Sequence, residues 1–325
     1  MKFLICGGAG YVGSHMVRYL IQAGHEVVVF DDLSTGHREA VPDDVPFVHG
    51  DIGDAVTLWR LFATHRFDAV MHFCARSLVG ESVVDPYQYY RNNVGNTLVL
   101  LAAMREVKID KLVFSSTAAV FGHPRSDAID ETHPTDPINP YGQSKLMIER
   151  VLADAYKAYG LSSVALRYFN AAGADPSATI GEAHNPETHL IPNLLKAVLG
   201  HGPGLKVFGD DYDTRDGTCV RDYVHVNDLA SAHLLAVEYL DENPGAYTFN
   251  LGNGEGFSVR EVIAAAARVT SRPVPHEFAE RRPGDPATLV ASSARARETL
   301  GWKPHVALLD DILASAWHWH LQPRY

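Results

Sequence analysis

The sequence predicts an α/β protein with a Rossmann-type doubly wound parallel sheet and a smaller mixed α/β C-terminal domain. Short apolar runs alternate with helical periodicity as far as about residue 170, and the first run leads directly into closely spaced glycines. The alternation then fails, because residues 171–189 are rich in Gly, Pro, Ala and polar side chains. We therefore expect one domain over residues 1–170, with a segment near 225–255 returning to it, and a second mainly over residues 171–325.

The elements follow from periodicity and capping signals. Buried strands are expected at residues 3–6, 26–30, 47–49, 69–73, 112–115 and 164–168, and residues 246–251 are expected to return to the same sheet. Helices are expected from about residue 11, from residue 140, over 190–199 and 227–240 between the later loops, over 259–269 and over 307–320. Ser258 and Glu261 have the spacing of a capping box, which starts the helix at 259.

Three glycines follow the first strand. Gly7, Gly10 and Gly13 let the backbone turn sharply and approach a pyrophosphate, whose charge suits the N-terminus of the helix that begins near Tyr11. Asp31 ends the second strand 24 positions after Gly7, about where a carboxylate binds the hydroxyls of an adenosine ribose. No arginine follows Asp31 directly, so the sequence favours NAD over NADP.

Other polar residues end the remaining strands of the sheet, where ligands of such folds bind. Asp51 and Ile52 suit the edge of an adenine, although a polar strand end beside a turn is an equally good interpretation. The other strand ends carry Phe73 to Ala75, Ser115 to Thr117, and Asn170.

A tyrosine and a lysine four positions apart carry the predicted chemistry. Asn139 is a favoured N-cap and Pro140 a favoured first helical residue, so Tyr141 and Lys145 lie on one face of the first turns. Lowering a tyrosine pKa from about 10 to near 7 requires about 4 kcal/mol, which Lys145 and a nicotinamide cation could supply together. Thr117 provides a hydroxyl partner at a strand end.

Composition narrows the function classes. The 325 residues carry a formal charge of -11, which argues against general nucleic-acid affinity. The 3 cysteines are far apart, as expected for reduced thiols in a cytoplasmic protein. The apolar run before Gly7 is too short for a signal peptide, and no run approaches the roughly 18 residues of a membrane span.

These motifs together resemble the extended short-chain dehydrogenases/reductases. In its finer pattern the chain is similar to the members that epimerise UDP-sugars at C4. That similarity extends over nearly the whole chain and is carried by H-F-C-A-R-S-L-V-G-E-S, Y-Y-R-N-N, R-Y-F-N-A-A-G-A, D-Y-D-T-R-D-G-T-C-V-R-D-Y and R-R-P-G-D-P-A. The resemblance implies NAD-dependent interconversion of UDP-glucose and UDP-galactose through a 4-keto sugar. It further implies a homodimer formed through helices near residues 92–105 and 141–156.

The resemblance assigns roles to individual residues. Tyr141 would take the proton from the sugar O4, Thr117 would bind the reacting oxygen, and Lys145 would bind the nicotinamide ribose and tune Tyr141. The NAD site would comprise Gly7, Gly10, Tyr11, Val12, Gly13, Asp31, Asp51, Ile52, Phe73, Ala75, Asn93, Tyr141, Lys145 and Tyr168, with Tyr168 also near the sugar. The UDP-sugar site would comprise Thr117, Tyr141, Asn170, Leu190, Phe208, Arg221, Arg282, Asp285 and Leu289.

Other interpretations remain open. The chain could epimerise a UDP-N-acetylhexosamine, UDP-glucuronate or a UDP-pentose, or dehydrate a nucleotide sugar, although Ala118 and Ala119 replace the acidic pair that dehydration needs. It could also bind a dinucleotide without turnover. Ser77 stands where some relatives have Lys, which puts that contact in doubt. We predict no metal site: His318 and His320 diverge on a helix, and Asp211, Asp213 and Asp216 precede a glycine that is one place late for a calcium loop.

Overall fold

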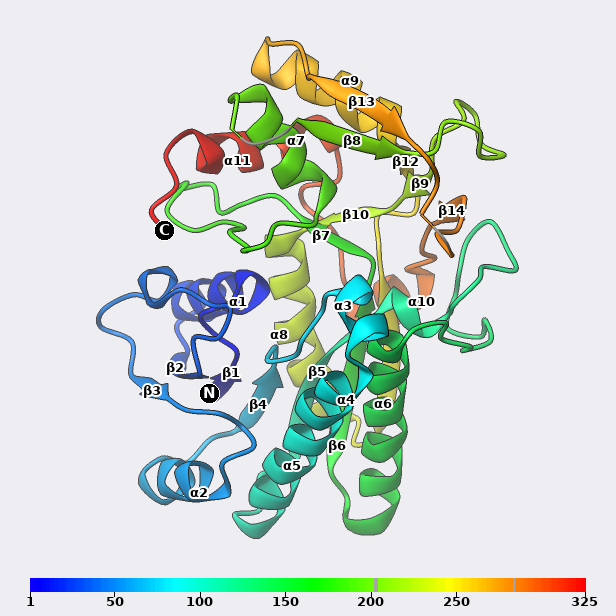
Figure 1. The fold of residues 1–325 in the computed structure, drawn as a ribbon. Helices are drawn as coiled ribbons and strands as arrows, with labels where there is room; N and C mark the ends of the chain where they lie inside the picture. The colour runs from blue at the N-terminus through cyan, green and yellow to red at the C-terminus, as the bar shows by residue number, and fades with distance from the viewer. Residues whose placement is uncertain (202–203, 283) are drawn as a thin grey trace.

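The computed structural model describes residues 1–201, 204–282 and 284–325. Pro283, which belongs to the R-R-P-G-D-P-A motif, lies outside the described residues, as do residues 202–203 of a predicted loop. The centre of the fold is a seven-stranded sheet whose strands all run parallel, in the order β11-β6-β5-β4-β1-β2-β3 (Figure 1). Its strands are β1 (Lys2–Cys6), β2 (Glu26–Asp31), β3 (Phe47–His49), β4 (Ala69–His72), β5 (Lys111–Thr117), β6 (Ser162–Tyr168) and β11 (Ala246–Leu251).

Helices cover both faces of this sheet. They are α1 (Tyr11–Gln22), α2 (Ala55–Thr64), α3 (Val79–Val84), α4 (Pro86–Tyr89), α5 (Thr97–Glu106), α6 (Pro140–Tyr159), α8 (Val226–Glu242) and α10 (Ala294–Leu300), and a π-helical segment over Tyr90–Asn96 precedes α5. Alternate residues of each central strand enter two separate cores, as the two-residue period of a strand requires. One core contains α1 and α8, and the other contains α2, α5 and α6.

A smaller unit lies at the carboxyl ends of the central strands (Figure 1). Its elements are β7 (Asn170–Ala172), α7 (Leu190–Val198), β8 (Leu205–Phe208), β9 (Val220–Arg221), β10 (Tyr223–His225), β12 (Phe257–Ser258), α9 (Val259–Thr270), β13 (His276–Ala279), β14 (Thr288–Leu289) and α11 (Leu309–Leu321). Its core is formed by α7, α9, α11 and β8. The strands form one short sheet β12-β9-β14 and the two pairs β10-β7 and β13-β8.

The predicted fold class is confirmed, since the sheet is parallel and doubly wound and a smaller unit follows it. Residues 246–251 return to the sheet beside β6, as predicted. The helix expected over 227–240 is α8, which packs against α1 and the sheet rather than within the smaller unit. The domain boundary at residue 170 stays a prediction. No helix among the described residues is long and apolar enough to cross a membrane.

Candidate active site

The glycine loop lies between β1 and α1, and its backbone is too closely packed for side chains. Gly7 has a φ of +81°, and a Cβ there would lie 2.6 Å from the backbone nitrogen of Cys74. A Cβ on Gly13 would lie 2.0 Å from the Gly7 carbonyl oxygen. Gly10 precedes the first residue of α1 and provides no side-chain cap, so the helix N-terminus depends on another acceptor. A pyrophosphate fits this cradle, which Tyr11 and Val12 follow directly.

Asp31 connects the end of β2 to the glycine loop. Its Oδ2 accepts a hydrogen bond from the Ala9 backbone N–H at 2.8 Å, and its Oδ1 accepts one from the Leu33 N–H at 2.8 Å. Burial raises the pKa of Asp31, while the two backbone N–H groups favour the carboxylate. Each oxygen retains a lone pair, so the carboxylate can still accept hydrogen bonds from ribose hydroxyls.

The other predicted cofactor residues line the same edge of the sheet. Asp51 accepts hydrogen bonds from the Gly53 N–H and the Asn96 side chain, and Ile52 is buried. Phe73 and Ala75 follow the end of β4. Asn93 is buried and bonds both the backbone of Arg76 and the Ser144 hydroxyl, so it holds the chain after β4 against α6. Asn93 therefore shapes the site whether or not it contacts a ligand.

Tyr141 and Thr117 are brought together where α6 begins. The Asn139 side chain accepts from the Gly142 N–H at 2.8 Å, and Pro140 is the first helical residue, as the sequence predicts. A Cβ on Gly142 would lie 2.4 Å from the Ala119 carbonyl oxygen, so the first turn of α6 packs directly on the turn after β5. Burial raises the pKa of Tyr141, and its hydrogen bond with Thr117 lowers that pKa in part.

Lys145 lies beneath Tyr141 and is directed at the sheet. Its Nζ donates to the Ser115 carbonyl oxygen at 2.6 Å and lies 6.0 Å from the centre of the Tyr141 ring. Burial lowers the pKa of Lys145 to about 8. In this structure burial thus raises the pKa of Tyr141, opposite to the direction that the Tyr–Lys spacing suggests. The lowered pKa stays a prediction for the NAD-bound state.

A buried ion pair that was not predicted from the sequence involves the same helix as these residues. Arg167 on β6 donates to both carboxylate oxygens of Glu149 on α6, and the Ser116 hydroxyl donates to the same carboxylate. Both charged side chains are almost fully buried. The contact joins α6 to β5 and β6 within one or two turns of Tyr141 and Lys145, so it fixes the helix that carries them. Glu149 lies four residues after Lys145 on the same helix, and that spacing is the only signal in the sequence.

The predicted substrate residues of the smaller unit are held in pairs. Arg221 on β9 donates from Nη2 to Asp285 Oδ1 at 2.9 Å and from Nη1 to the Pro286 carbonyl oxygen at 2.9 Å. The guanidinium of Arg282 lies 4.0 Å from the centre of the Phe208 ring. These four residues come from β8, β9 and the segment before β14, so long-range pairing brings them together.

The remaining predicted substrate residues lie on β7, α7 and β14. Asn170 on β7 donates to the Asp222 carbonyl oxygen at 2.8 Å, and Leu190 is the first residue of α7. Leu289 on β14 is paired with Arg221 and packs on the apolar cluster that includes Ala118 and Phe121, directly after Thr117. Tyr168 ends β6 and its hydroxyl is hydrogen-bonded to Ser115. The structure thus pairs Leu289 with Arg221 and packs it against the turn that follows Thr117.

Comparisons with known proteins agree with this geometry. Residues 3–252 match the model of the NAD dependent epimerase/dehydratase family. The chain is 53% identical over 320 residues to the UDP-glucose 4-epimerase of Halalkalibacterium halodurans, covering 98% of this chain and 96% of that protein. It superposes with a TM-score of 0.95 on the UDP-glucose 4-epimerase of Brucella ovis in complex with NAD, at 49% identity and 98% coverage of each chain. It also superposes with a TM-score of 0.95 on the Bifidobacterium longum enzyme in complex with NAD+ and UDP, at 38% identity and 99% coverage of each chain.

Proposed function

Because the chain belongs to the NAD dependent epimerase/dehydratase family, we propose that it is an isomerase that interconverts UDP-glucose and UDP-galactose with bound NAD. The observation that carries the proposal is the pairing of Tyr141 with Thr117 at the carboxyl edge of the same parallel sheet whose first strand leads into the glycine cradle. When bound, NAD supplies a reversible hydride acceptor at C4 of the sugar. The preference for NAD over NADP follows from Asp31, whose carboxylate would repel a 2′-phosphate.

The chain's own residues carry the proton and hold the sugar. Tyr141 accepts the proton of the sugar O4 as C4 is oxidised, and it returns the proton after the 4-keto sugar has rotated to present its other face. The Thr117 hydroxyl lies beside the Tyr141 hydroxyl and orients the reacting oxygen. Lys145 is buried with its pKa lowered to about 8, so its charge responds to small changes around it and can stabilise a phenolate.

The uridine diphosphate would bind to the smaller unit. Arg221 presents a planar guanidinium whose geometry suits the oxygens of the diphosphate. Phe208, with Arg282 over its ring, offers an aromatic side chain near which the uracil base would bind. Asn170 and Leu190 would line the passage between the two units, and Asp285 orients Arg221. These assignments are proposals that rest on the positions of the residues and on the family resemblance.

A homodimer and a cytoplasmic location complete the proposal. Large apolar side chains are exposed on the helices expected to pair, Leu98 on α5 and Met147 on α6, and also on the nearby α3 and α4, where they are Val83, Val84 and Tyr87. Such a patch on neighbouring helices is typical of a protein interface. The three cysteines are free, which suits a reducing compartment.

Product analysis tests the activity directly. Purified protein is incubated with UDP-galactose, UDP-glucose or their N-acetyl forms, without added NAD or reductant, and the products are separated by anion-exchange chromatography. We expect the same final ratio of UDP-glucose to UDP-galactose whichever of the two is the starting sugar. A product lighter by one water in mass spectrometry would instead indicate a dehydratase. Tightly held NAD with no conversion of any UDP-sugar would indicate a dinucleotide-binding protein without turnover.

A further inference from the structure

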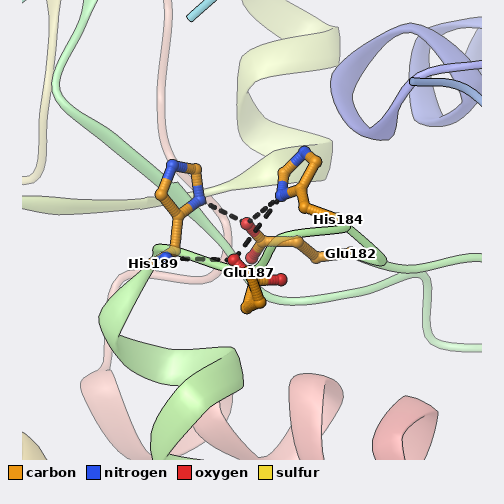
Figure 2. Close-up of side chains that lie close together, drawn as sticks. All are labelled: Glu182, His184, Glu187 and His189. Carbon is orange, nitrogen blue, oxygen red and sulfur yellow. Dashed lines mark hydrogen bonds and ion pairs between the residues drawn. The ribbon is translucent and has the colours of Figure 1, made fainter. Parts of the chain in front are cut away.

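Four side chains meet in the loop between β7 and α7, away from the predicted catalytic residues. They are Glu182, His184, Glu187 and His189, here called the Glu-His cluster (Figure 2). One ligand atom from each, a carboxylate oxygen or an imidazole nitrogen, lies within 4.8 Å of all the others. Both histidines direct Nδ1 at Glu182 Oε1, and His184 Nδ1 lies 3.2 Å from it. This cluster is separate from the two motifs, His318 with His320 and Asp211 to Asp216, for which the sequence predicts no metal binding.

The charges of this cluster are not balanced by lysine or arginine. The Glu182 and Glu187 side chains each retain only 4% of their exposure, and among the described residues their only ion-pair partners are the two histidines. Although burial opposes the charged form, the contacts with Glu182 and Glu187 raise the pKa of His184 to about 10, and Glu182 raises the pKa of His189, so two imidazolium protons balance the two carboxylates. A divalent metal ion would replace those two protons at the same net charge and use all four groups.

One atom of the cluster lacks a partner in the free chain. Glu187 Oε1 accepts from the backbone N–H groups of Thr188 and His189, both at 2.9 Å, whereas Oε2 is buried and has no hydrogen-bond partner. A buried carboxylate oxygen without a donor is rare in folded proteins. Glu187 would bind the ion through Oε1, which lies 3.6 Å from His184 Nδ1, and a cation so close would compensate the charge that Oε2 buries without a donor.

We propose that the Glu-His cluster binds one zinc ion with a two-histidine, two-glutamate ligand set. Imidazole nitrogen and carboxylate oxygen bind zinc at about 2.0–2.2 Å, so neighbouring ligand atoms of a tetrahedral site lie about 3.4 Å apart. The observed spread of the four atoms requires shifts of less than about 1 Å to reach that geometry. Cysteine is absent from the set, and the mixed N/O donors favour zinc over calcium or magnesium, which prefer oxygen alone.

The surroundings hold the four residues in position. The Trp319 indole N–H donates to the Glu182 carbonyl oxygen at 3.0 Å, and the Tyr325 hydroxyl contacts the backbone of Gly181. His189 is the residue before α7, so the helix fixes its direction. Outer contacts of this kind typically orient metal ligands.

The cluster also lies against the glycine loop of the other unit. The His184 ring packs edge-on against the Tyr11 ring with centres 6.2 Å apart, and the Ala183 carbonyl oxygen lies 2.9 Å from His37 Nε2. His37 in turn bonds the Ala9 carbonyl oxygen through its backbone N–H. The zinc ion is therefore structural. It fixes the loop between β7 and α7, which also packs against the start of α1.

Metal content and affinity test the site on the purified full chain. The protein is stripped with a chelator, reloaded with zinc chloride and dialysed, and zinc per chain is measured by mass spectrometry. We expect one zinc per chain, and an anomalous difference peak at the zinc edge between the four side chains in crystals. Cobalt(II) should give the visible absorption of a tetrahedral site at the same stoichiometry.

Two variants and two matched controls locate the binding. His184→Ala and Glu187→Gln should each weaken zinc binding by more than about a hundredfold in competition with a chromogenic chelator, beyond the usual effect of an outer contact. His318→Ala and Glu255→Gln change exposed residues outside the cluster and should leave zinc affinity unchanged. Substoichiometric zinc in the wild type, equal zinc in wild type and variants, or a peak elsewhere would each overturn the proposal. None of these measurements depends on the epimerase activity.

Discussion

The two sides of the active site hold their side chains by different means. On the dinucleotide side, residues follow the ends of three- to seven-residue strands of one continuous sheet, which is packed between two cores. On the sugar side, Arg221 and Leu289 lie on strands of only two residues each. There, the side chains are fixed mainly by each other, through the Arg221–Asp285 ion pair and the stacking of Arg282 on Phe208.

This difference separates the chemistry from recognition. Tyr141, Lys145 and Thr117 lie on closely packed backbone, and Lys145 is bonded to the Ser115 carbonyl oxygen, an arrangement that suits a catalytic group. Arg221 is already bonded to Asp285 and to the Pro286 carbonyl oxygen, so a diphosphate bound as proposed would compete with Asp285 or share the guanidinium with it. Substitutions on the dinucleotide side should therefore lower kcat, and substitutions on the sugar side should raise KM.

Tyr141→Phe should give the largest effect. Removing the hydroxyl leaves no proton acceptor for the sugar O4, and kcat should fall by at least about a hundredfold. Steady-state kinetics with UDP-galactose measures the loss, and bound NAD is quantified after denaturation to show that the cofactor site is intact. Tyr159→Phe, on the exposed end of the same helix, is the matched control and should retain full activity. Full activity in Tyr141→Phe would remove this residue from the mechanism.

Arg221→Lys should act mainly on KM. Lysine keeps the charge but loses the planar fork that binds Asp285 and the Pro286 carbonyl together, and a lost charge-assisted hydrogen bond costs about 1.5–3 kcal/mol. We expect KM for the UDP-sugar to rise by about ten- to a hundredfold with a smaller change in kcat.

The control for this change is Arg215→Lys. The guanidinium of Arg215 also binds a carboxylate, the side chain of Glu261, but Arg215 is not among the predicted substrate residues. Its replacement should leave KM within about twofold of the wild type, because an exposed pair contributes little. If both lysine variants raise KM equally, the effect comes from general loosening of the smaller unit.

Low pH should lower the free energy of unfolding, because two histidines are buried on the dinucleotide side of the fold. His233 on α8 donates from Nδ1 to the Leu229 carbonyl oxygen, while its Nε2 is buried without a partner, and burial lowers the pKa of His233 to about 4. His15 on α1 is bonded in the same way to Tyr11, faces Asp175, Arg18 and His225, and also has its pKa lowered to about 4. Between pH 6.5 and 4 the unfolded chain binds protons that the folded chain does not, so the free energy of unfolding falls as the pH falls.

Chemical denaturation at pH 7, 5.5 and 4.5 checks this expectation. Each such histidine should cost about 2–3 kcal/mol of stability by pH 4.5, from about 1.4 kcal/mol per pH unit. His233→Asn keeps a donor near the Leu229 carbonyl but cannot titrate, so its stability should depend less steeply on pH than that of the wild type. An unchanged slope would mean that His233 is already protonated in the folded state.

The same contrast explains how far the sequence could predict the structure. Gly7, Asp31, Thr117 and Tyr141 follow strands or caps with local signals, and their placement at one edge follows from the parallel sheet. The pairing of β9 with β12 and β14 joins segments up to about 70 residues apart, and two-residue strands have no readable period. Glu149 and Arg167 were missed because a buried ion pair depends on packing in three dimensions. The Glu-His cluster was missed because its four residues alternate along a loop that has no regular structure.

The smallest effect expected concerns the size of the sugar, and it depends on Leu289. This side chain is half-buried, lies opposite Arg221 in the short sheet and packs beside Ala118 and Phe121. An acetamido group needs room for about four heavy atoms, and overpacking a cleft typically costs about 1–3 kcal/mol, or about a ten- to two-hundredfold loss in kcat/KM. Leucine is smaller than tyrosine and larger than serine, so we expect efficient epimerisation of UDP-galactose and weak activity with UDP-N-acetylgalactosamine. Leu289→Tyr should abolish the weak activity and spare the other, whereas Leu289→Ser should raise it. The ratio of the two kcat/KM values in the three proteins decides the matter, because a ratio that stays constant would place Leu289 outside the sugar pocket.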